Sequence, residues 1–289
     1  MIITIDNRAG FCPGVQRAIK KAEENLENSE TFHSLGSLLH NELEMGRLEG
    51  KGLKIAHQYD LPELKGKKLL IRTHGEPPET YEEAARQGVE LIDVTCGVVK
   101  RLQHKVRMAA DEMREVDGTV VIFGKKDHPE VIGLLGHADG RGKLVTAEAD
   151  LDTINLRNAV RLFAQTTMDI DRYEEIYELL LLKVKEFNAV PDLIKYNSIC
   201  KYVSNRIPAL KKFASGYEVI IFVSGSDSAN GKKLFKVCSE VNESSYFLSE
   251  KDEPKPEWFL GVNSVGISGA ASTPLWLMED VANKIKQIN

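Results

Sequence analysis

The sequence predicts an α/β protein with mostly parallel sheets, divided into several similar parts. Short apolar runs alternate with helical patterns along all 289 residues. Such alternation of strands and helices is typical of parallel sheets covered by helices. Three cysteines also recur in similar local settings at roughly equal intervals, which indicates a threefold repetition of related units.

The expected elements follow from the apolar runs and from the helical patterns between them. We expect strands at residues 2–5, 68–73, 89–94, 119–124, 160–165, 218–223 and 264–269. We expect helices at 14–27, 79–87, 97–115, 171–187, 200–214 and 273–287. The segments GKLVTAEADLD and KPEWF are interpreted as connections. No low-complexity linker is visible, so we expect closely packed domains at 14–96, 97–195 and 196–289, the last completed by the N-terminal strand in 1–13.

Composition excludes several classes of protein. Hydrophobic residues make up 42% and charged residues 28%, as in an ordinary soluble globular protein. The net charge of −5 gives no sign of nucleic-acid binding, which favours a basic surface. No apolar run is long enough for a membrane span, and no signal peptide is visible. We therefore expect a cytoplasmic protein, a monomer or weak dimer, in a compartment that keeps thiols reduced.

Three of the four cysteines share one local pattern. The segments FCPGVQR, TCGVVKR and ICKYVSNR place Cys12, Cys96 and Cys200 directly before helical patterns. The amino end of a helix favours a thiolate through its free N–H groups and its dipole. Any one of these residues could be an ordinary packed thiol, but three in the same setting indicate a shared site. Cys238 occupies an apolar position of a helical pattern, and we interpret it as a core thiol.

Three cysteine ligands suit a [4Fe–4S] cluster better than zinc. Structural zinc normally takes four protein ligands. A cubane cluster usually takes four thiolates, so three thiolates leave one iron with an open position. An open iron can act as a Lewis acid on a substrate, and we therefore predict a catalytic cluster.

Polar residues follow five of the predicted strands, where open α/β sheets bind their ligands. They are His74, His128, Glu130, Thr166, Thr167, Ser228, Asn230 and Ser272. Ser- and Asn-containing turns before helices suit a phosphate, although these residue types are also common helix caps. Together with His40 in LLHNE, they indicate a diphosphate site.

His128 and Glu130 form the candidate pair for proton transfer. A carboxyl group buried beside an apolar ligand has a raised pKa and can donate a proton near neutrality. An alternative interpretation is structural, since Pro129 and Glu130 also suit the first turn of a helix. The two interpretations are compatible.

The sequence resembles the 4-hydroxy-3-methylbut-2-enyl diphosphate reductases of the non-mevalonate isoprenoid pathway. The resemblance runs almost end to end through GFCPGV, LLHNE, RTHG, DVTC, HPEVIG, AQTT, SIC…NR, SDSANG and GAASTP. It implies a trefoil of three similar small α/β domains around a central iron–sulfur cluster. By the matching motifs, the cluster ligands are Cys12, Cys96 and Cys200. The implied diphosphate contacts are His40, His74, Ser228, Asn230 and Ser272, and Thr166 is placed among the substrate-binding residues.

The resemblance also implies a reaction. His128, Glu130 and Thr167 match the residues around the substrate hydroxyl, and Glu130 matches the proton donor. The implied reaction is a two-electron, two-proton reductive dehydroxylation of a small allylic diphosphate to isopentenyl and dimethylallyl diphosphate. The chain has no flavin or nicotinamide fingerprint, so we expect electrons from a ferredoxin or flavodoxin.

The sequence departs from the family pattern at three places. Ala229 stands where a second serine is usual, Gly97 stands where proline is usual, and SGAAS replaces TAGAS. Two alternatives therefore stay open. One is a paralogous [4Fe–4S] reductase or lyase that acts on another small anionic substrate, and the other is a cluster-based sensor.

Overall fold

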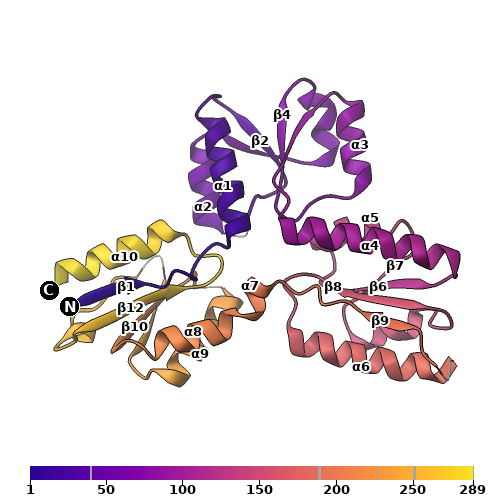
Figure 1. Cartoon of the computed structure of the whole chain (residues 1–289). Helices are drawn as coiled ribbons and strands as arrows, with labels where there is room; N and C mark the ends of the chain where they lie inside the picture. Colours follow the sequence, from indigo (N-terminus) through magenta and orange to yellow (C-terminus); the bar gives the residue numbers. More distant parts are fainter. Residues whose placement is uncertain (40, 188–189, 227, 250–251, 289) are drawn as a thin grey trace. The chain divides into compact units, whose positions relative to one another are not determined.

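The computed structural model describes residues 1–39, 41–187, 190–226, 228–249 and 252–288 (Figure 1). The strands in this part of the chain form three sheets of four parallel strands each. Sheet A has the order β1 (Ile2–Ile5), β12 (Ser264–Gly269), β10 (Val219–Val223), β11 (Ser245–Leu248). Sheet B has the order β3 (Leu53–Ala56), β2 (Phe32–Leu35), β4 (Lys68–Ile71), β5 (Glu90–Asp93). Sheet C has the order β7 (Gly142–Val145), β6 (Thr119–Phe123), β8 (Val160–Ala164), β9 (Leu193–Lys195).

The three sheets share one strand order. In sheets B and C the first strand in sequence lies between the second and the third, and the fourth lies at the far edge. Sheet A repeats this order from β10 to β12, with the N-terminal strand β1 in the place of the fourth strand. The prediction of three similar parallel α/β domains is therefore confirmed.

Helices cover the sheets on both faces. The α-helices are α1 (Pro13–Leu26), α2 (Glu42–Gly50), α3 (Pro78–Arg86), α4 (Gly97–Glu115), α5 (Pro129–His137), α6 (Ile170–Phe187), α7 (Lys201–Ser204), α8 (Arg206–Ala214), α9 (Ala229–Val241) and α10 (Leu275–Ile288). Three short 3₁₀ helices are η1 (Gln58–Leu64), η2 (Glu148–Thr153) and η3 (Pro256–Phe259). In sheet C, Val121 and Phe123 pack in the core that includes α6, whereas Val120 and Ile122 pack in the core with α4 and α5. These residues belong to β6, and burial on both faces of the sheet explains why this strand is a continuous apolar run.

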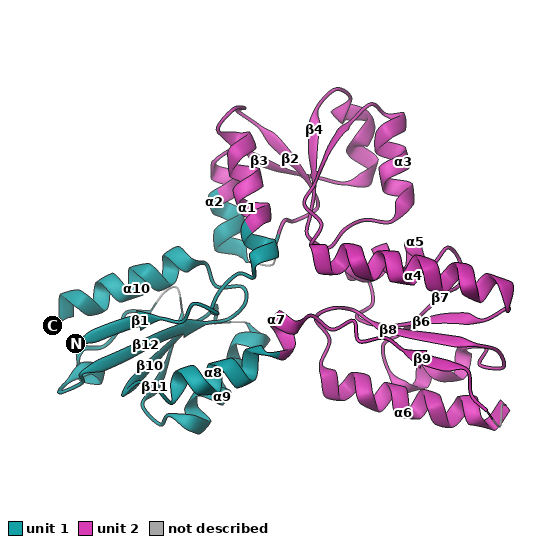
Figure 2. Cartoon of the chain, viewed as in Figure 1, with its two compact units in different colours: residues 1–16, 39–47, 205–289 teal, residues 17–38, 48–204 magenta. Residues whose placement is uncertain are grey.

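The chain divides into two compact units (Figure 2). Unit 1 comprises residues 1–16, 39–47 and 205–289, and it contains sheet A. Unit 2 comprises residues 17–38 and 48–204, and it contains sheets B and C. The predicted domain boundaries at 14–96, 97–195 and 196–289 remain a prediction.

Three sequence-based expectations are wrong. The segment GKLVTAEADLD is not a plain connection, because it contains the edge strand β7 and most of the 3₁₀ helix η2. The segment KPEWF is not one either, because it contains the 3₁₀ helix η3. The helix expected at 200–214 is two helices, α7 and α8, which belong to different units and are separated at Asn205. Arg206, the first residue of α8, turns inward to a buried carboxylate, as described below.

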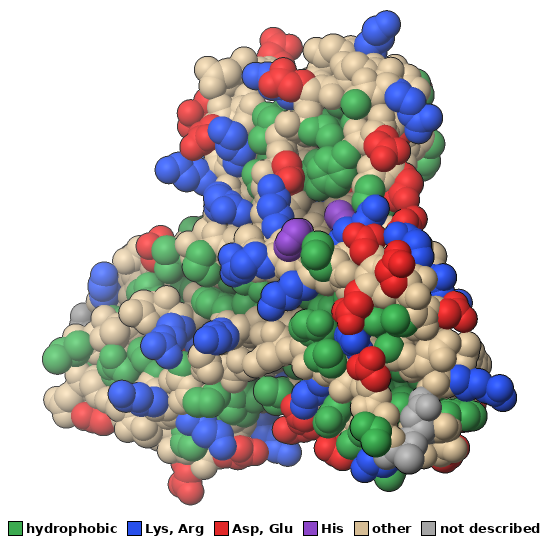
Figure 3. Space-filling model, turned by 45° about the vertical axis from the view of Figure 1, so that its right-hand side comes forward, with side chains coloured by type: hydrophobic (Ala, Val, Ile, Leu, Met, Phe, Trp, Pro, Cys, Tyr) green, Lys and Arg blue, Asp and Glu red, His purple; other side chains and the backbone are tan. Residues whose placement is uncertain are grey.

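The surface carries both signs of charge. On the face drawn in Figure 3, basic and acidic side chains are both present, with hydrophobic side chains between them. Among the described residues, no helix combines the length and the apolar character needed to cross a membrane.

Candidate functional site

The carboxyl ends of two neighbouring strands bring Glu130 and Thr166 together. Glu130 follows β6 and Thr166 follows β8, and these two strands are paired in parallel. The backbone N–H of Thr166 donates to Oε1 of Glu130 at 2.6 Å, and its hydroxyl lies 2.8 Å from Oε2. Both residues are almost inaccessible, with 1% and 5% of their surface exposed. Burial raises the pKa of the Glu130 carboxyl, and the two hydrogen bonds from Thr166 oppose this shift only in part.

Two histidines lie beside this pair. His128 caps the amino end of α5, where its Nδ1 accepts a hydrogen bond from the backbone N–H of Glu130 at 3.1 Å. The ring of His74 meets that of His128 edge to face, with 5.2 Å between centroids and 87° between planes. His74 follows β4 of sheet B, whereas His128 follows β6 of sheet C. The contact therefore joins loops from the two sheets of unit 2, and we call His74, His128, Glu130 and Thr166 the unit 2 site.

Two of the predicted cluster ligands border the unit 2 site. The backbone N–H of Cys96 donates to the carbonyl of Thr73, the residue before His74, at 3.0 Å. The backbone N–H of Cys200 donates to the carbonyl of Thr166 at 2.8 Å. Each cysteine is therefore fastened by its backbone to a loop that carries a residue of the site.

The thiols present fit the ligand set of an iron–sulfur cluster. Cys12, Cys96 and Cys200 are free, partly exposed, and placed directly before α1, α4 and α7. Cys238 is a core thiol, as predicted: it is 0% exposed, and burial raises its pKa to about 12. Cys12 belongs to unit 1, whereas Cys96 and Cys200 belong to unit 2.

A single metal ion has no candidate site in the described ranges. No three His, Cys, Asp or Glu side chains there converge closely enough to hold one. Thiolates are the usual ligands of iron–sulfur clusters, and the three partly exposed cysteines supply this type of donor.

Among the described residues, Thr167, which the resemblance places around the substrate hydroxyl, makes its side-chain hydrogen bond to Gln165 and not to Glu130. Its side chain is exposed, and its Oγ1 accepts a hydrogen bond from Nε2 of Gln165 at 2.9 Å. Oε1 of Gln165 in turn accepts from the backbone N–H of Lys125 at 3.0 Å. Gln165 thus ties the loop after β6 to the loop after β8. Sequence reasoning did not single it out, although it belongs to the AQTT motif.

The predicted phosphate-binding residues of unit 1 also follow neighbouring strands. Ser228 follows β10 and Ser272 follows β12, and these strands are paired in parallel. The hydroxyl of Ser228 caps α9 by accepting from the backbone N–H of Gly231 at 3.0 Å. Asn230 is exposed in the first turn of the same helix. The side chain of Ala229 lies outside the described part of the chain.

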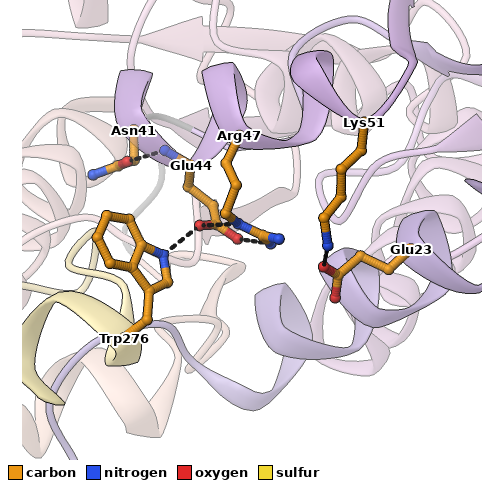
Figure 4. A network of polar contacts seen from close by, with 6 residues as sticks. All are labelled: Glu23, Asn41, Glu44, Arg47, Lys51 and Trp276. Carbon is orange, nitrogen blue, oxygen red and sulfur yellow. Dashed lines mark hydrogen bonds and ion pairs between the residues drawn. The ribbon is translucent and has the colours of Figure 1, made fainter. Parts of the chain in front are cut away.

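The segment next to His40 is fastened to the loop that carries Ser272. His40 itself lies outside the described residues. Nδ2 of Asn41 donates to the carbonyl of Ser272 at 2.9 Å, and its Oδ1 accepts from the backbone N–H of Glu44 at 2.7 Å. The Glu44 carboxylate also accepts from the indole N–H of Trp276 at 2.8 Å (Figure 4). Within unit 1, these contacts hold the segment that flanks His40 against the loop that follows β12.

A buried ion pair supports the end of β12. The guanidinium of Arg206 donates to Asp6 at 2.8 Å and to the hydroxyl of Ser268 at 2.9 Å. The Ser268 hydroxyl lies 2.8 Å from the same carboxylate of Asp6. The sequence pattern places Arg206 in the SIC…NR motif but gives no sign of its partner, which is 200 residues away in the chain.

Known proteins are similar to this chain over almost its whole length. The family described as LytB protein matches residues 3–286. A relative from Parabacteroides distasonis, named 4-hydroxy-3-methylbut-2-enyl diphosphate reductase, is 42% identical over 293 residues, which cover 99% of this chain and 98% of the relative. A relative of the same name from Porphyromonas gingivalis is 40% identical, and the match covers 99% of each chain.

Two solved structures are also similar. The first is described as (E)-4-hydroxy-3-methyl-but-2-enyl diphosphate reductase, the terminal enzyme of the non-mevalonate pathway. It has a TM-score of 0.85 and 36% identity, and the match covers 99% of this chain and all of the other. The second is the E-1-hydroxy-2-methyl-but-2-enyl-4-diphosphate reductase of Plasmodium falciparum, with a TM-score of 0.73 and 29% identity over 98% of this chain and 87% of the other.

Proposed function

Since the chain belongs to the LytB protein family, we propose that it is a 4-hydroxy-3-methylbut-2-enyl diphosphate reductase, an oxidoreductase of the non-mevalonate pathway. It reductively dehydroxylates the allylic alcohol to isopentenyl and dimethylallyl diphosphate. The observation that carries this proposal is the buried carboxyl of Glu130, whose pKa is raised, within a site bordered by Cys96 and Cys200. We also place the protein in the cytoplasm, where thiols stay reduced.

The cofactor we propose is a [4Fe–4S] cluster with Cys12, Cys96 and Cys200 as its three ligands. Such a cluster supplies single electrons and an iron with an open position for the substrate. The support lies in the three partly exposed thiols at helix amino ends and in the exclusion of the buried Cys238.

Glu130 is the proposed proton donor, and Thr166 is proposed to relay its proton to the substrate. Oε1 of Glu130 receives a fixed N–H donor, so the proton of the neutral carboxyl belongs on Oε2. From Oε2 it can be donated to Oγ1 of Thr166, whose own hydroxyl proton can pass to the leaving oxygen of the substrate. The contacts thus favour Thr166 over Thr167 as the residue that acts with Glu130.

The two histidines of the unit 2 site have different roles in this proposal. Nδ1 of His128 accepts the backbone N–H of Glu130, which orients the imidazole beside the proposed acid. His74, against the His128 ring, is one of the proposed diphosphate contacts together with His40. Ser228, Asn230 and Ser272 are the others, and Ser228 supports this role from the amino end of α9, where the helix dipole favours an anion.

A paralogous reductase acting on another small anion is the alternative that Ala229 raises. A hydroxyl bonded to phosphate is worth roughly 1.5–3 kcal/mol, so its absence weakens diphosphate binding by about ten- to a hundredfold. We expect the remaining contacts to keep the diphosphate bound. The sensor alternative needs no buried acid, so Glu130 argues against it.

The test is an anaerobic titration of the cluster-loaded protein with 4-hydroxy-3-methylbut-2-enyl diphosphate, followed by turnover with reduced methyl viologen. We expect the visible spectrum of the cluster to change on titration and both isomeric products to form. Ala229→Ser should lower KM with little change in kcat. A flat titration and no products in both proteins would exclude this substrate and favour the paralogue.

A further inference from the structure

A basic pocket lies next to Cys96 and is not used by the proposed chemistry. It has a volume of about 500 Å³, and its lining comes from α1, from β5 and from the start of α4. The lining residues that matter here are Arg17, Lys20, Lys21, Lys100, Thr95 and Gly97, all in unit 2.

The pocket lies beside a proposed cluster ligand in the sequence. Thr95 and Gly97, the two neighbours of Cys96 in sequence, both line it. Arg17 fixes the wall of the pocket by donating to the carbonyl of Thr95 at 3.1 Å. Because electron tunnelling weakens steeply with distance, this is a favourable place for electrons to enter.

The charge of the pocket is opposite to that of the whole chain. Four cationic side chains line it against two carboxylates, Glu24 and Asp93, whereas the chain has a net charge of −5. Arg17, Lys20 and Lys100 are exposed. A positive surface of this kind steers a negatively charged partner and fixes its orientation.

The contacts that the four cationic side chains already make favour a protein over a small anion as the partner that binds at this pocket. Lys100 pairs with Asp93 at 2.6 Å, Lys21 pairs with Glu24 at 3.1 Å, and Arg17 is bonded to backbone carbonyls. Three of the four cations are therefore already held, so they are not arranged to enclose one compact anion. They can still meet the spread carboxylates of a protein surface.

We propose that this surface docks an acidic, one-electron carrier protein of the ferredoxin class. This proposal rests on the proposed function. Reduction of the allylic alcohol breaks one C–O bond and consumes two electrons and two protons, giving one water and one isopentenyl or dimethylallyl diphosphate. Two molecules of reduced carrier, each oxidised by one electron, balance the reaction.

The test compares two charge reversals of equal size. Lys20→Glu/Lys21→Glu changes the pocket, and Lys211→Glu/Lys212→Glu changes two exposed lysines of α8 in unit 1. The first measurement is the Kd of the cluster-loaded proteins for an acidic [2Fe–2S] ferredoxin, by calorimetry at low salt. We expect the pocket variant to raise Kd about tenfold or more, which is about 1.4 kcal/mol, and the α8 variant to leave it near the wild-type value. High salt should reduce the difference.

A second measurement separates docking from chemistry. Turnover driven by methyl viologen should be unchanged in the pocket variant, while turnover driven by ferredoxin should need more ferredoxin. If methyl viologen gives no turnover in the wild-type protein, the proposed function fails, but the ferredoxin Kd still decides the docking surface. Should the double variant be unstable, the single change Lys20→Glu on the exposed side of α1 gives the same comparison.

Three results would overturn the docking surface. The first is that the pocket variant keeps the wild-type Kd for ferredoxin. The second is that the α8 variant weakens ferredoxin binding equally, which would assign the effect to overall charge. The third is that inorganic diphosphate binds the wild-type protein but not the pocket variant, while ferredoxin binding is unchanged. The last result would make the pocket a site for a small anion.

Discussion

Glu130 and Thr166 make two hydrogen bonds to each other, one through the Thr166 backbone and one through its hydroxyl. The backbone N–H can only donate, so it fixes Oε1 of the carboxyl as an acceptor. The hydroxyl can donate or accept, so Oε2 can hold a proton or release it without losing its partner. This asymmetry suits a buried acid that gives up a proton in each catalytic cycle.

Glu130→Gln should reduce turnover with little effect on substrate binding. Glutamine keeps the size of the side chain and an acceptor for the Thr166 N–H, but it cannot supply a proton. General acid catalysis contributes about 10²–10⁴-fold, so kcat should fall by that order. Steady-state kinetics with methyl viologen give kcat and KM separately, and near-normal kcat would move the acid to another group.

Thr166→Val should be far more damaging than Thr167→Val. Valine at 166 keeps the backbone bond to Glu130 but removes the hydroxyl at Oε2, so we expect kcat to fall about 10²-fold. The hydroxyl of Thr167 is bonded to Gln165 at the surface, so its loss should change kcat by no more than about twofold. Kinetics of both variants side by side check this, and the reverse order of effects would restore Thr167 as the partner of Glu130.

The pH profile should show the raised pKa of Glu130. A raised pKa means that the folded protein keeps this proton to a higher pH than an ordinary carboxyl does. The acid is therefore available at low pH and is lost as pH rises through the folded pKa, so kcat should fall on the alkaline side. The measurement is kcat against pH for the wild-type protein and for Glu130→Gln, in which this alkaline limb should be absent. An unchanged limb in the variant would assign it to another group.

The sequence predicts the central strands better than the edges. The central strands β6 and β10 pack against cores on both faces of their sheets, and each is a nearly continuous apolar run. The edge strands β3 and β7 carry exposed lysines, Lys54 and Lys143, and have no such pattern. Tertiary pairing alone makes them strands.

The site is predictable at the level of motifs but not of contacts. HPEVIG and AQTT mark the right loops, yet neighbouring residues at a strand end point in different directions. Only the fold distinguishes Thr166, buried against Glu130, from the exposed Thr167. The meeting of His74 and His128 depends on how sheets B and C pack, and no local pattern encodes it.

Replacing any one of Cys12, Cys96 and Cys200 by serine should sharply reduce bound iron. Each is a proposed ligand, and a cluster left with two thiolates is poorly held. Cys238→Ala should retain iron, because this thiol is buried in the core of unit 1. Iron content per chain after anaerobic purification measures this directly, independently of activity. A protein that keeps full iron after loss of one of the three, or loses it with Cys238→Ala, would refute the ligand assignment.

Asp6→Asn should destabilise unit 1 strongly. Asp6 and Arg206 are 6% and 7% exposed, so removing the carboxylate leaves a buried guanidinium without its counter-charge. Breaking such a pair typically costs about 3–5 kcal/mol. Both tryptophans, Trp258 and Trp276, lie in unit 1, so urea unfolding followed by tryptophan fluorescence reports on this unit. The control is Glu253→Gln, which removes one of the two carboxylates that pair with Lys284 at the surface of unit 1 (the other is Asp280) and should cost no more than about 1 kcal/mol. If the two variants unfold at the same urea concentration, the buried ion pair contributes no more to the stability of unit 1 than a surface ion pair does.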